Sequence, residues 1–377
     1  MIYLDFNRTT PLSPSTREAM EPFWTSHFML PGQEHPHARA VAEAIETSRE
    51  RVASMVGCEP FELVFTGGGT EANNLAILGA AAEASTDLRG RSHLLVCTLE
   101  HDSVLDAARS LVRHGWEVET FAPGPGGVVD PDHVAAKLRR HTRLVCLQLA
   151  NPILGTLQPI REVADRCHAA GVRVHCDTTQ AFGKLPVDVR QLRVDTAAVS
   201  GHKFYGPKGS GAVFVRRGLT LAPIGFGESR EMGLRPGSEN VPGWIGLGAA
   251  ADMAGRCAAQ VAERLTELRD RLVARLVDVI RPTPRILCQA SPRLPNTVAV
   301  EMPIASTRIR RAARDLVVTT ARSSDPPDEC TRALRSAGSG EAEIARTICI
   351  SLGWTTSQDE VDRAGELLAD AADGRAD

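Results

Sequence analysis

Between about residues 60 and 245 the sequence alternates short apolar runs with segments of helical periodicity. A short apolar run bounded by turn residues is typical of a buried strand, and a strand–helix–strand rhythm predicts a mostly parallel sheet with helices on both faces. The expected strands are 62–66, 93–98, 116–121, 143–149, 173–177, 195–200 and 211–216. The expected helices include 71–84, 102–114 and 160–170. These elements constrain the chain to an α/β fold.

The pattern changes near residue 250. A long helical stretch is followed by the proline-containing segment RPTPR, a short strand within NTVAVEM and further helices. This order of elements predicts a second, smaller α+β domain. We therefore expect a large α/β domain over residues 15–248 and a small domain formed by residues 1–14 together with residues 249–377.

Composition argues against several classes of protein. The formal net charge is -3, so the chain lacks the basic surface that captures nucleic acid or an anionic membrane. No apolar run reaches the roughly 18 residues that predict a transmembrane helix, and the first residues lack the pattern of a secretory signal. The nine cysteines form no CxxC pair. We therefore expect no metal site, and reduced thiols in a cytoplasmic protein.

A glycine-rich turn follows the first expected strand. The segment FELVFTGGGTEANNLAIL places Gly67, Gly68 and Gly69 before a helix that begins near Thr70. Backbone N–H groups at a helix N-terminus bind anions, and glycine lets a phosphate approach closely. The segment is neither a GxGxxG dinucleotide fingerprint nor a P-loop. Taken alone, it fits either phosphate binding or a tight turn without a ligand.

Two further segments place a charged side chain where a buried strand ends. Asp177 ends the strand at 173–177, at the edge where parallel sheets bind ligands. A buried carboxylate needs a partner, although a helix cap or a turn explains a single aspartate equally well. Lys203 follows the strand at 195–200, where desolvation makes a lysine amine nucleophilic. A solvated surface lysine is the alternative.

Together the three segments match what pyridoxal phosphate requires. The cofactor's phosphate needs an anion site, its pyridinium nitrogen needs a carboxylate, and its aldehyde needs a lysine that forms a Schiff base. The turn at Gly69 and Thr70, the carboxylate of Asp177 and the amine of Lys203 supply these three functions. The sequence therefore predicts a pyridoxal-phosphate protein.

At this point the chain resembles the cysteine desulfurases, the NifS-like and IscS-like proteins of the class V aminotransferase group. The resemblance covers nearly the whole chain, and SGHK with the upstream DxxQ is its most specific part. It rests on YLDFNRTTPLSP (3–14), VFTGGGTEANNLAI (64–77), LEHDSVL (99–105), HCDTTQAFGKLPVD (175–188), SGHKFYGPKGSGAVFVRR (200–217) and GLRPGSENVP (233–242). It implies the type I fold of pyridoxal-phosphate enzymes, with a mostly parallel seven-stranded sheet and a smaller α+β domain.

The resemblance also implies a role for each matching residue. Lys203 is then the Schiff-base lysine, and His101 stacks on the pyridine ring and relays protons. Asp177 pairs with the pyridinium nitrogen, and Gln180 faces the phenolic oxygen. The phosphate is surrounded by Gly69, Thr70, Ser200 and His202. Ser238 matches a residue that reaches the phosphate of the neighbouring subunit, which implies a homodimer with shared active sites.

The chain departs from the family's pattern at three places. The family's asparagine near the cofactor corresponds to a position within NPILG (151–155). Either Asn151 takes that role, which we expect, or Pro152 replaces it. The loop that carries the sulfur-accepting cysteine is shortened, and Cys330 comes later, on the following helix. Cys349 stands where the family has the arginine that binds the substrate carboxylate, and a thiol lacks the two parallel donors of a guanidinium.

These departures leave the reaction open. We hypothesise that Arg8, or Arg322 in the shortened loop, replaces the missing arginine. The first interpretation is an enzyme that acts on cysteine or a related sulfur or selenium amino acid, with a sulfur-acceptor protein as a further partner. The alternatives are a lyase or aminotransferase for another amine, and a cofactor-binding scaffold or partner subunit without desulfurase activity. A nicotinamide enzyme is disfavoured because the GxGxxG fingerprint is missing.

Overall fold

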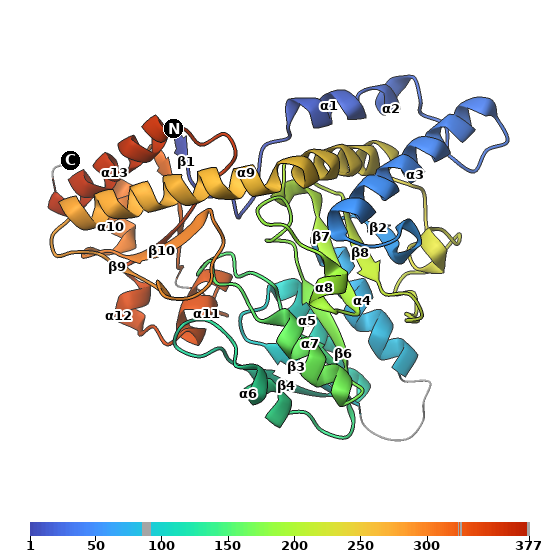
Figure 1. Ribbon diagram of the computed structural model, residues 1–377, viewed down its shortest axis with the longest axis horizontal. Coiled ribbons are helices and arrows are strands. Elements are labelled where there is room, and N and C mark those ends of the chain that lie inside the picture. The colour runs from blue at the N-terminus through green and yellow to red at the C-terminus, as the bar shows by residue number, and fades with distance from the viewer. Residues whose placement is uncertain (85–91, 323, 325, 375–377) are drawn as a thin grey trace.

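A seven-stranded sheet forms the centre of the larger part of the molecule (Figure 1). The computed structural model describes residues 1–84, 92–322, 324 and 326–374. The strand order is β2-β8-β7-β6-β5-β3-β4, and only the pairs made by β8 are antiparallel. The bounds are β2 Leu63–Thr66, β3 His93–Cys97, β4 Glu117–Phe121, β5 Thr142–Cys146, β6 Arg173–Asp177, β7 Thr196–Ser200 and β8 Gly211–Val215. The predicted fold class is confirmed, and each expected strand is present.

Helices cover both faces of this sheet, as the sequence predicts. Successive residues of a strand point to opposite faces. Val64 and Leu94 belong to a buried cluster with α4 (Gly69–Ala84) and α5 (Asp102–Ser110). Their neighbours Phe65 and Leu95 belong to a second cluster. This second cluster includes residues of α3 (Pro36–Val56), α7 (Ile160–Ala169) and α9 (Val241–Val279).

A four-stranded antiparallel sheet lies in the smaller part. Its order is β12-β13-β10-β9, with bounds Thr319–Thr320, Thr347–Ser351, Thr297–Glu301 and Arg285–Ile286. A third buried cluster joins this sheet to α9, α10 (Ser306–Ala312) and α13 (Gln358–Asp373). The N-terminal strand β1 (Ile2–Tyr3) pairs in parallel with β11 (Leu316–Val317), and Ile2 and Leu4 belong to the same cluster.

The 39-residue helix α9 runs through both parts of the molecule (Figure 1). It begins at Val241 because the side chain of Asn240 accepts the N–H of Gly243 and Pro242 occupies the first turn. The expected domain boundary at residues 248 and 249 therefore falls inside a continuous helix. The division into two domains stays a prediction.

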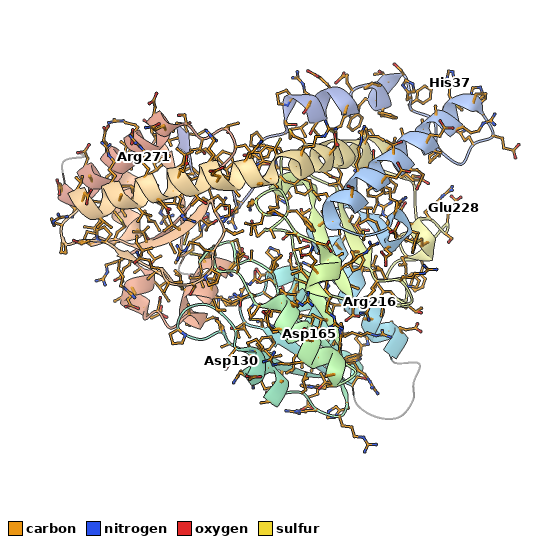
Figure 2. The ribbon with its side chains drawn as sticks, viewed as in Figure 1. His37, Asp130, Asp165, Arg216, Glu228 and Arg271 are labelled. Atoms are coloured by element: carbon orange, nitrogen blue, oxygen red, sulfur yellow. The ribbon has the colours of Figure 1, made fainter. Side chains whose placement is uncertain are left out.

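The remaining elements are short and lie around these two sheets. They are α1 (Pro14–Met20), α2 (Pro22–Thr25), α6 (Pro131–Ala136), α8 (Val189–Leu192), α11 (Glu329–Ser336) and α12 (Glu341–Ile344), with 3-10 turns at Pro60–Glu62, Leu111–His114, Gly201–Lys203 and Glu231–Gly233. Charged side chains such as Asp130, Glu228 and Arg271 project from the outside of the molecule (Figure 2). Of the described helices, α9 included, none combines the length and the apolar character that a membrane span requires.

Candidate active site

The carboxyl ends of several strands open into one cavity of about 470 Å³. Because β6 and β7 are parallel neighbours, Asp177 and Ser200 end at the same edge of the sheet. The 3-10 turn after β7 adds Lys203, and the loop after β3 adds His101. The opposite wall comes from the N-terminal segment and the smaller part, with Arg8, Thr319, Glu329, Cys349 and Ser351.

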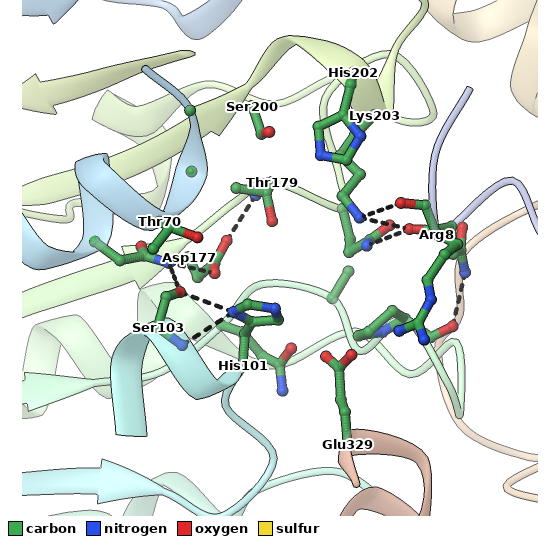
Figure 3. Close-up of a pocket in the computed structure, with 18 of the residues that line it drawn as sticks. Arg8, Thr70, His101, Ser103, Asp177, Thr179, Ser200, His202, Lys203 and Glu329 are labelled. Carbon is green, nitrogen blue, oxygen red and sulfur yellow. Dashed lines mark hydrogen bonds between the residues drawn. The ribbon is translucent and has the colours of Figure 1, made fainter. Parts of the chain in front are cut away.

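One end of the cavity is suited to a phosphate. The N-terminus of the 16-residue α4 lies there, with Thr70, Ser200 and His202 among the lining residues (Figure 3). The backbone is packed closely, because a Cβ atom added at Gly69 would lie 2.9 Å from Cγ2 of Thr179. Unpaired N–H groups of a helix start attract anions. The predicted residues Gly69, Thr70, Ser200 and His202 are therefore brought together at a place whose chemistry fits a phosphate.

Asp177 lies deep in the cavity and is 6% exposed. Its Oδ2 accepts a hydrogen bond from Nδ2 of Asn73 at 2.8 Å, and its Oδ1 accepts the N–H of Thr179 at 2.9 Å. These donors stabilise the charged carboxylate in a buried position. A buried carboxylate of this kind fits a protonated ring nitrogen.

His101 stands at the start of α5, where its ring caps the helix. Its Nδ1 accepts the backbone N–H of Ser103 at 3.1 Å and lies 2.8 Å from Oγ of Ser103 (Figure 3). The cap holds the imidazole in one orientation at the wall of the cavity. Its position beside Asp177 and opposite Lys203 is consistent with the expected stacking role.

The amine of Lys203 is held by two backbone carbonyl groups. Nζ donates to the oxygen of Asn7 at 2.8 Å and to that of Arg8 at 2.9 Å. Burial lowers the pKa of Lys203, which increases the neutral, nucleophilic fraction of the amine. The structure therefore gives this lysine the environment that the sequence predicts.

Gln180 donates to the same backbone carbonyl of Asn7, and a second lysine, Lys184, lies beside it and donates to the Asn7 side chain. Nε2 of Gln180 donates to the oxygen of Asn7 at 3.0 Å, and Oε1 of Gln180 accepts from Nζ of Lys184 at 2.6 Å. Burial lowers the pKa of Lys184 well below its ordinary value, and the nearby charge of Lys203 acts in the same direction. Gln180 thus presents its amide N–H groups on the side of Lys203.

Two predicted ligands are not among the residues that line the cavity in the described part of the chain. Asn151 is fully buried, and its Oδ1 accepts the N–H groups of Ile153 and Leu154 at 3.0 and 2.8 Å. Its amide thus stabilises a turn, and Pro152 lines the cavity in its place. Ser238 is exposed and lies outside this cavity. Its expected role concerns a neighbouring subunit and stays a prediction.

Cys330 and Cys349 form a buried pair of thiols with their Sγ atoms 3.8 Å apart. Cys330 lies on α11, as expected from the sequence, and only Cys349 lines the cavity. The hydrogen bond with Cys330, together with burial, raises the pKa of Cys349 well above its ordinary value. A thiol of this kind is a poor nucleophile, because the thiolate is the reactive form.

The hypothesised replacements for the missing arginine differ in position. Arg8 lines the cavity, whereas Arg322 is exposed and is absent from the lining residues of the described chain. Within the part of the chain that the structure describes, the Arg8 guanidinium makes no hydrogen bond or close ion pair; burial raises the pKa of the nearby Asp5 carboxyl, and the charge of Arg8 acts against that rise. The backbone carbonyl of Arg8 already contacts Lys203.

Sequence reasoning missed several residues that line the cavity. Asn73 lies inside one of the family-like segments without a role implied for it, and Asn7 precedes Arg8 in the first such segment. Glu329 directs its carboxylate into the cavity from the start of α11 (Figure 3). No local pattern marked Glu329, because its place depends on how α11 packs against the larger part. The segment before it contains residues 323 and 325, which lie outside the described residues.

Comparison with known proteins shows the family. Residues 2–363 match the family model described as aminotransferase class-V. A cysteine desulfurase IscS of Dictyoglomus turgidum is 40% identical over 79% of this chain and 74% of its own length. One from an Anaeromyxobacter species is 36% identical over 98% of this chain and 92% of its own length.

Solved structures agree as well. A NifS-like protein has a TM-score of 0.91 at 28% identity, with 99% of both chains covered. A structure of SspA in complex with cysteine has a TM-score of 0.81 at 30% identity, covering 93% of this chain and 99% of its own. The chain therefore belongs to the class V aminotransferase family, in its group of NifS-like and IscS-like cysteine desulfurases.

Proposed function

We propose that this chain is a pyridoxal-phosphate enzyme that acts on cysteine or a related sulfur or selenium amino acid, with Lys203 as the lysine that carries the cofactor. One observation carries the proposal. The desolvated amine of Lys203, the carboxylate of Asp177 and the N-terminus of α4 meet in a single cavity. The names of the relatives support the substrate class, as does SspA, a solved relative in complex with cysteine.

Each residue has a distinct task in this proposal. When bound, pyridoxal phosphate supplies an electron sink for negative charge at the α-carbon of the substrate. Thr70, Ser200 and His202 would hold the phosphate, and Asp177 would hold the ring nitrogen in its protonated form. Gln180 would donate toward the phenolic oxygen. The Lys203 amine would act as the general base that takes the α-proton of the substrate.

Arg8 is the residue that we propose to bind the substrate carboxylate. Its guanidinium faces the cavity without an ion-pair partner among the described residues, and guanidinium–carboxylate pairs form two parallel hydrogen bonds. We expect Arg8→Ala to raise the KM for the amino acid about tenfold or more, since hydrogen bonds to charged groups contribute about 1.5–3 kcal/mol. Arg322→Ala and the exposed control Arg17→Ala should leave KM unchanged. An unchanged KM in Arg8→Ala excludes this role.

The thiol groups that line the cavity favour β-elimination as a second candidate reaction on the same class of substrate. Sulfur transfer to the enzyme needs an accessible thiolate, and among the described lining residues only Cys349 carries a thiol, which has a raised pKa. Elimination of the β-substituent needs no enzyme thiol. Cysteine and water then yield pyruvate, ammonia and hydrogen sulfide. We therefore propose β-elimination as the alternative to desulfuration.

A homodimer belongs to the same proposal. Ser238 is exposed, as are the large apolar side chains of Phe226 and Met232 earlier in the same segment, and it would contribute to the neighbouring subunit's phosphate site. If so, Ser238→Ala and Lys203→Ala should complement one another, because a mixed dimer contains one site in which both residues are intact. A mixture that is no more active than the two separate variants would contradict shared sites.

The test begins with the cofactor. Purified protein is loaded with pyridoxal phosphate, reduced with borohydride and digested, and mass spectrometry should find the label on Lys203. Lys203→Ala should retain none. Unreduced protein is then incubated with L-cysteine and a reductant, and alanine, pyruvate and sulfide are measured. Alanine supports desulfuration, pyruvate supports elimination, and neither product with bound cofactor supports a scaffold. A protein without label on Lys203 contradicts the proposal.

A further inference from the structure

A continuous chain of hydrogen bonds lies beneath the cavity and connects Asp177 with His101. Asn73, on the first turn of α4, is at its centre. Its Nδ2 lies 2.8 Å from Oδ2 of Asp177 and 2.9 Å from Oγ of Ser103 (Figure 3). The same Ser103 oxygen lies 2.8 Å from Nδ1 of His101. The two sides of the cavity are therefore joined through one amide group.

His175 determines which way that amide faces. Its Nε2 lies 3.0 Å from Oδ1 of Asn73, and its Nδ1 lies 2.9 Å from Oγ1 of Thr196. Burial lowers the pKa of His175 to about 4, so the ring is neutral near pH 7 and carries one proton. A reversed amide would place its oxygen against the carboxylate of Asp177, which repels it. The proton of His175 is therefore on Nε2, where it donates to Asn73.

The direction of each remaining bond follows from this orientation. Both hydrogens of the Asn73 amide are donated, one to Asp177 and one to the hydroxyl oxygen of Ser103. Nδ1 of His101 already accepts the backbone N–H of Ser103 at 3.1 Å, so it carries no proton. The Ser103 hydroxyl must then donate to the same Nδ1. His101 is left with its proton on Nε2.

We propose that Asn73, oriented by His175, is a positioning residue that sets the charge environment of Asp177 and the tautomer of His101 together. The inference rests on the proposed function, because Asp177 and His101 are the groups that would face the ring of the cofactor. His175 lies outside the lining residues of the described chain, and the hydrogen bond that links it to them is the one to Asn73. One buried histidine would in this way prepare both sides of the site.

Nitrogen-15 NMR of the histidine rings in cofactor-free protein tests the tautomer directly. In the wild type we expect a protonated Nε2 and a bare Nδ1 at His101, with the signals assigned by comparison with His101→Gln. In Asn73→Leu the Ser103 hydroxyl loses its donor, so the two His101 signals should move toward one another. The control is Gln260→Leu, which replaces an exposed amide on α9 that does not line the cavity. Its His101 signals should match the wild type.

Cofactor binding gives an independent second measurement. We expect Asn73→Leu to bind pyridoxal phosphate about tenfold more weakly than Gln260→Leu and to shift the pH midpoint of the bound cofactor's absorption. His175→Leu should have the same effect in weaker form, and His175→Gln, which keeps an N–H near the Nε2 position, should restore the wild-type values.

These measurements overturn the inference in two ways. It is wrong if Asn73→Leu and Gln260→Leu give the same His101 signals and the same cofactor spectrum. If Asn73→Leu fails to fold, the two His175 variants test the inference instead. Identical His101 signals and identical cofactor affinity in His175→Leu and His175→Gln would exclude the positioning role. A wild-type protein that does not bind the cofactor contradicts the proposed function, but the tautomer measurement on cofactor-free protein stands apart from that result.

Discussion

At the scale of single residues, burial decides which groups in the cavity are reactive. Lys203 becomes a better nucleophile because burial lowers the pKa of its amine. The same effect makes Cys349 less reactive, because the charged form of a thiol is the thiolate and burial raises its pKa. One cavity therefore favours amine chemistry and disfavours thiol chemistry.

The thiol pair provides a direct test of this difference. We expect Cys349→Ala and Cys330→Ala to turn over L-cysteine within about threefold of the wild type, since both thiols are buried and the pKa of Cys349 is raised well above its ordinary value. Cys257→Ala, on α9 and outside the cavity, is the control. Products are measured as alanine and pyruvate. Loss of product in a folded Cys349→Ala variant would identify Cys349 as the sulfur acceptor and would exclude elimination without an enzyme thiol.

His175 predicts a pH dependence of stability. The folded state keeps this imidazole neutral down to about pH 4, whereas the unfolded chain protonates it at the ordinary pKa of 6.5. Between these values the unfolded state binds more protons, so stability is lost as the pH falls from 6.5 toward 4. The loss amounts to roughly 3 kcal/mol at most. Urea unfolding at several pH values should show that the free energy of unfolding falls less with pH in His175→Gln than in the wild type. An equal fall in both proteins would contradict the prediction.

At the scale of elements, α4 has an apolar face that packs against the sheet and an N-terminal turn that lies in the cavity. Ala72, Leu75 and Ala76 are buried against the sheet, and they fix the helix in place. Its first turn at Gly69 and Thr70 then lies where the strand β2 ends, in the cavity. The apolar face thus positions the anion-binding end.

Gly69→Ala tests how closely that end is packed. The added Cβ would lie 2.9 Å from Cγ2 of Thr179 and 3.3 Å from Cβ of Ser200, so the turn must shift. We expect at least about tenfold weaker binding of pyridoxal phosphate, measured by fluorescence titration, since binding depends on closely placed N–H groups. Gly255→Ala on α9 meets no atom within 4 Å and should bind as the wild type does. Equal affinities for both variants would show that the turn tolerates a side chain.

At the scale of the whole molecule, the cavity exists only where the two parts meet. Asn7 connects them from the N-terminal segment. Its Nδ2 donates to the oxygen of Pro152 and to Oγ1 of Thr297, each at 2.8 Å. Its Oδ1 accepts from Lys184 at 2.9 Å and from Asn296 at 3.1 Å. One buried amide thus contacts residues around both sheets and supports the backbone carbonyl that holds Lys203.

Asn7→Ala should therefore affect both stability and the site. Removing the amide takes one hydrogen bond from each of several buried polar groups, including the amine of Lys184, which keeps its bond to Gln180, and each lost hydrogen bond costs about 0.5–1.5 kcal/mol. We expect a loss of roughly 3–5 kcal/mol in the free energy of unfolding, measured by urea denaturation, together with weaker cofactor binding. Gln260→Ala, which removes an exposed amide on α9, should lose less than about 1 kcal/mol. A similar small loss in both variants would exclude Asn7 as a structural connection.

The sequence by itself determined the elements and the principal reactive groups. Alternation of apolar runs, the glycine turn before α4 and the strand-end positions of Asp177 and Lys203 are local properties, because they depend on neighbours within a few residues. The α/β fold followed from them, whereas the proposed grouping of Gly69, Thr70, Ser200 and His202 around a phosphate came from the resemblance to the cysteine desulfurases. The helix α9 begins at Val241, earlier than the start near residue 250 that the sequence pattern indicated. Its first part packs against the larger sheet.

Tertiary structure alone decided how these groups are held. The Asn151 side chain bonds a turn instead of lining the cavity, whereas Glu329 lines it. His175 bonds Asn73, from which it is 102 residues distant in the chain. Lys203 is held by a carbonyl group 196 residues distant in the chain. No periodicity predicts such pairs, because a hydrogen bond between remote residues depends on the register and packing of whole elements. The sequence named the reactive groups, and packing set their orientation, burial and charge.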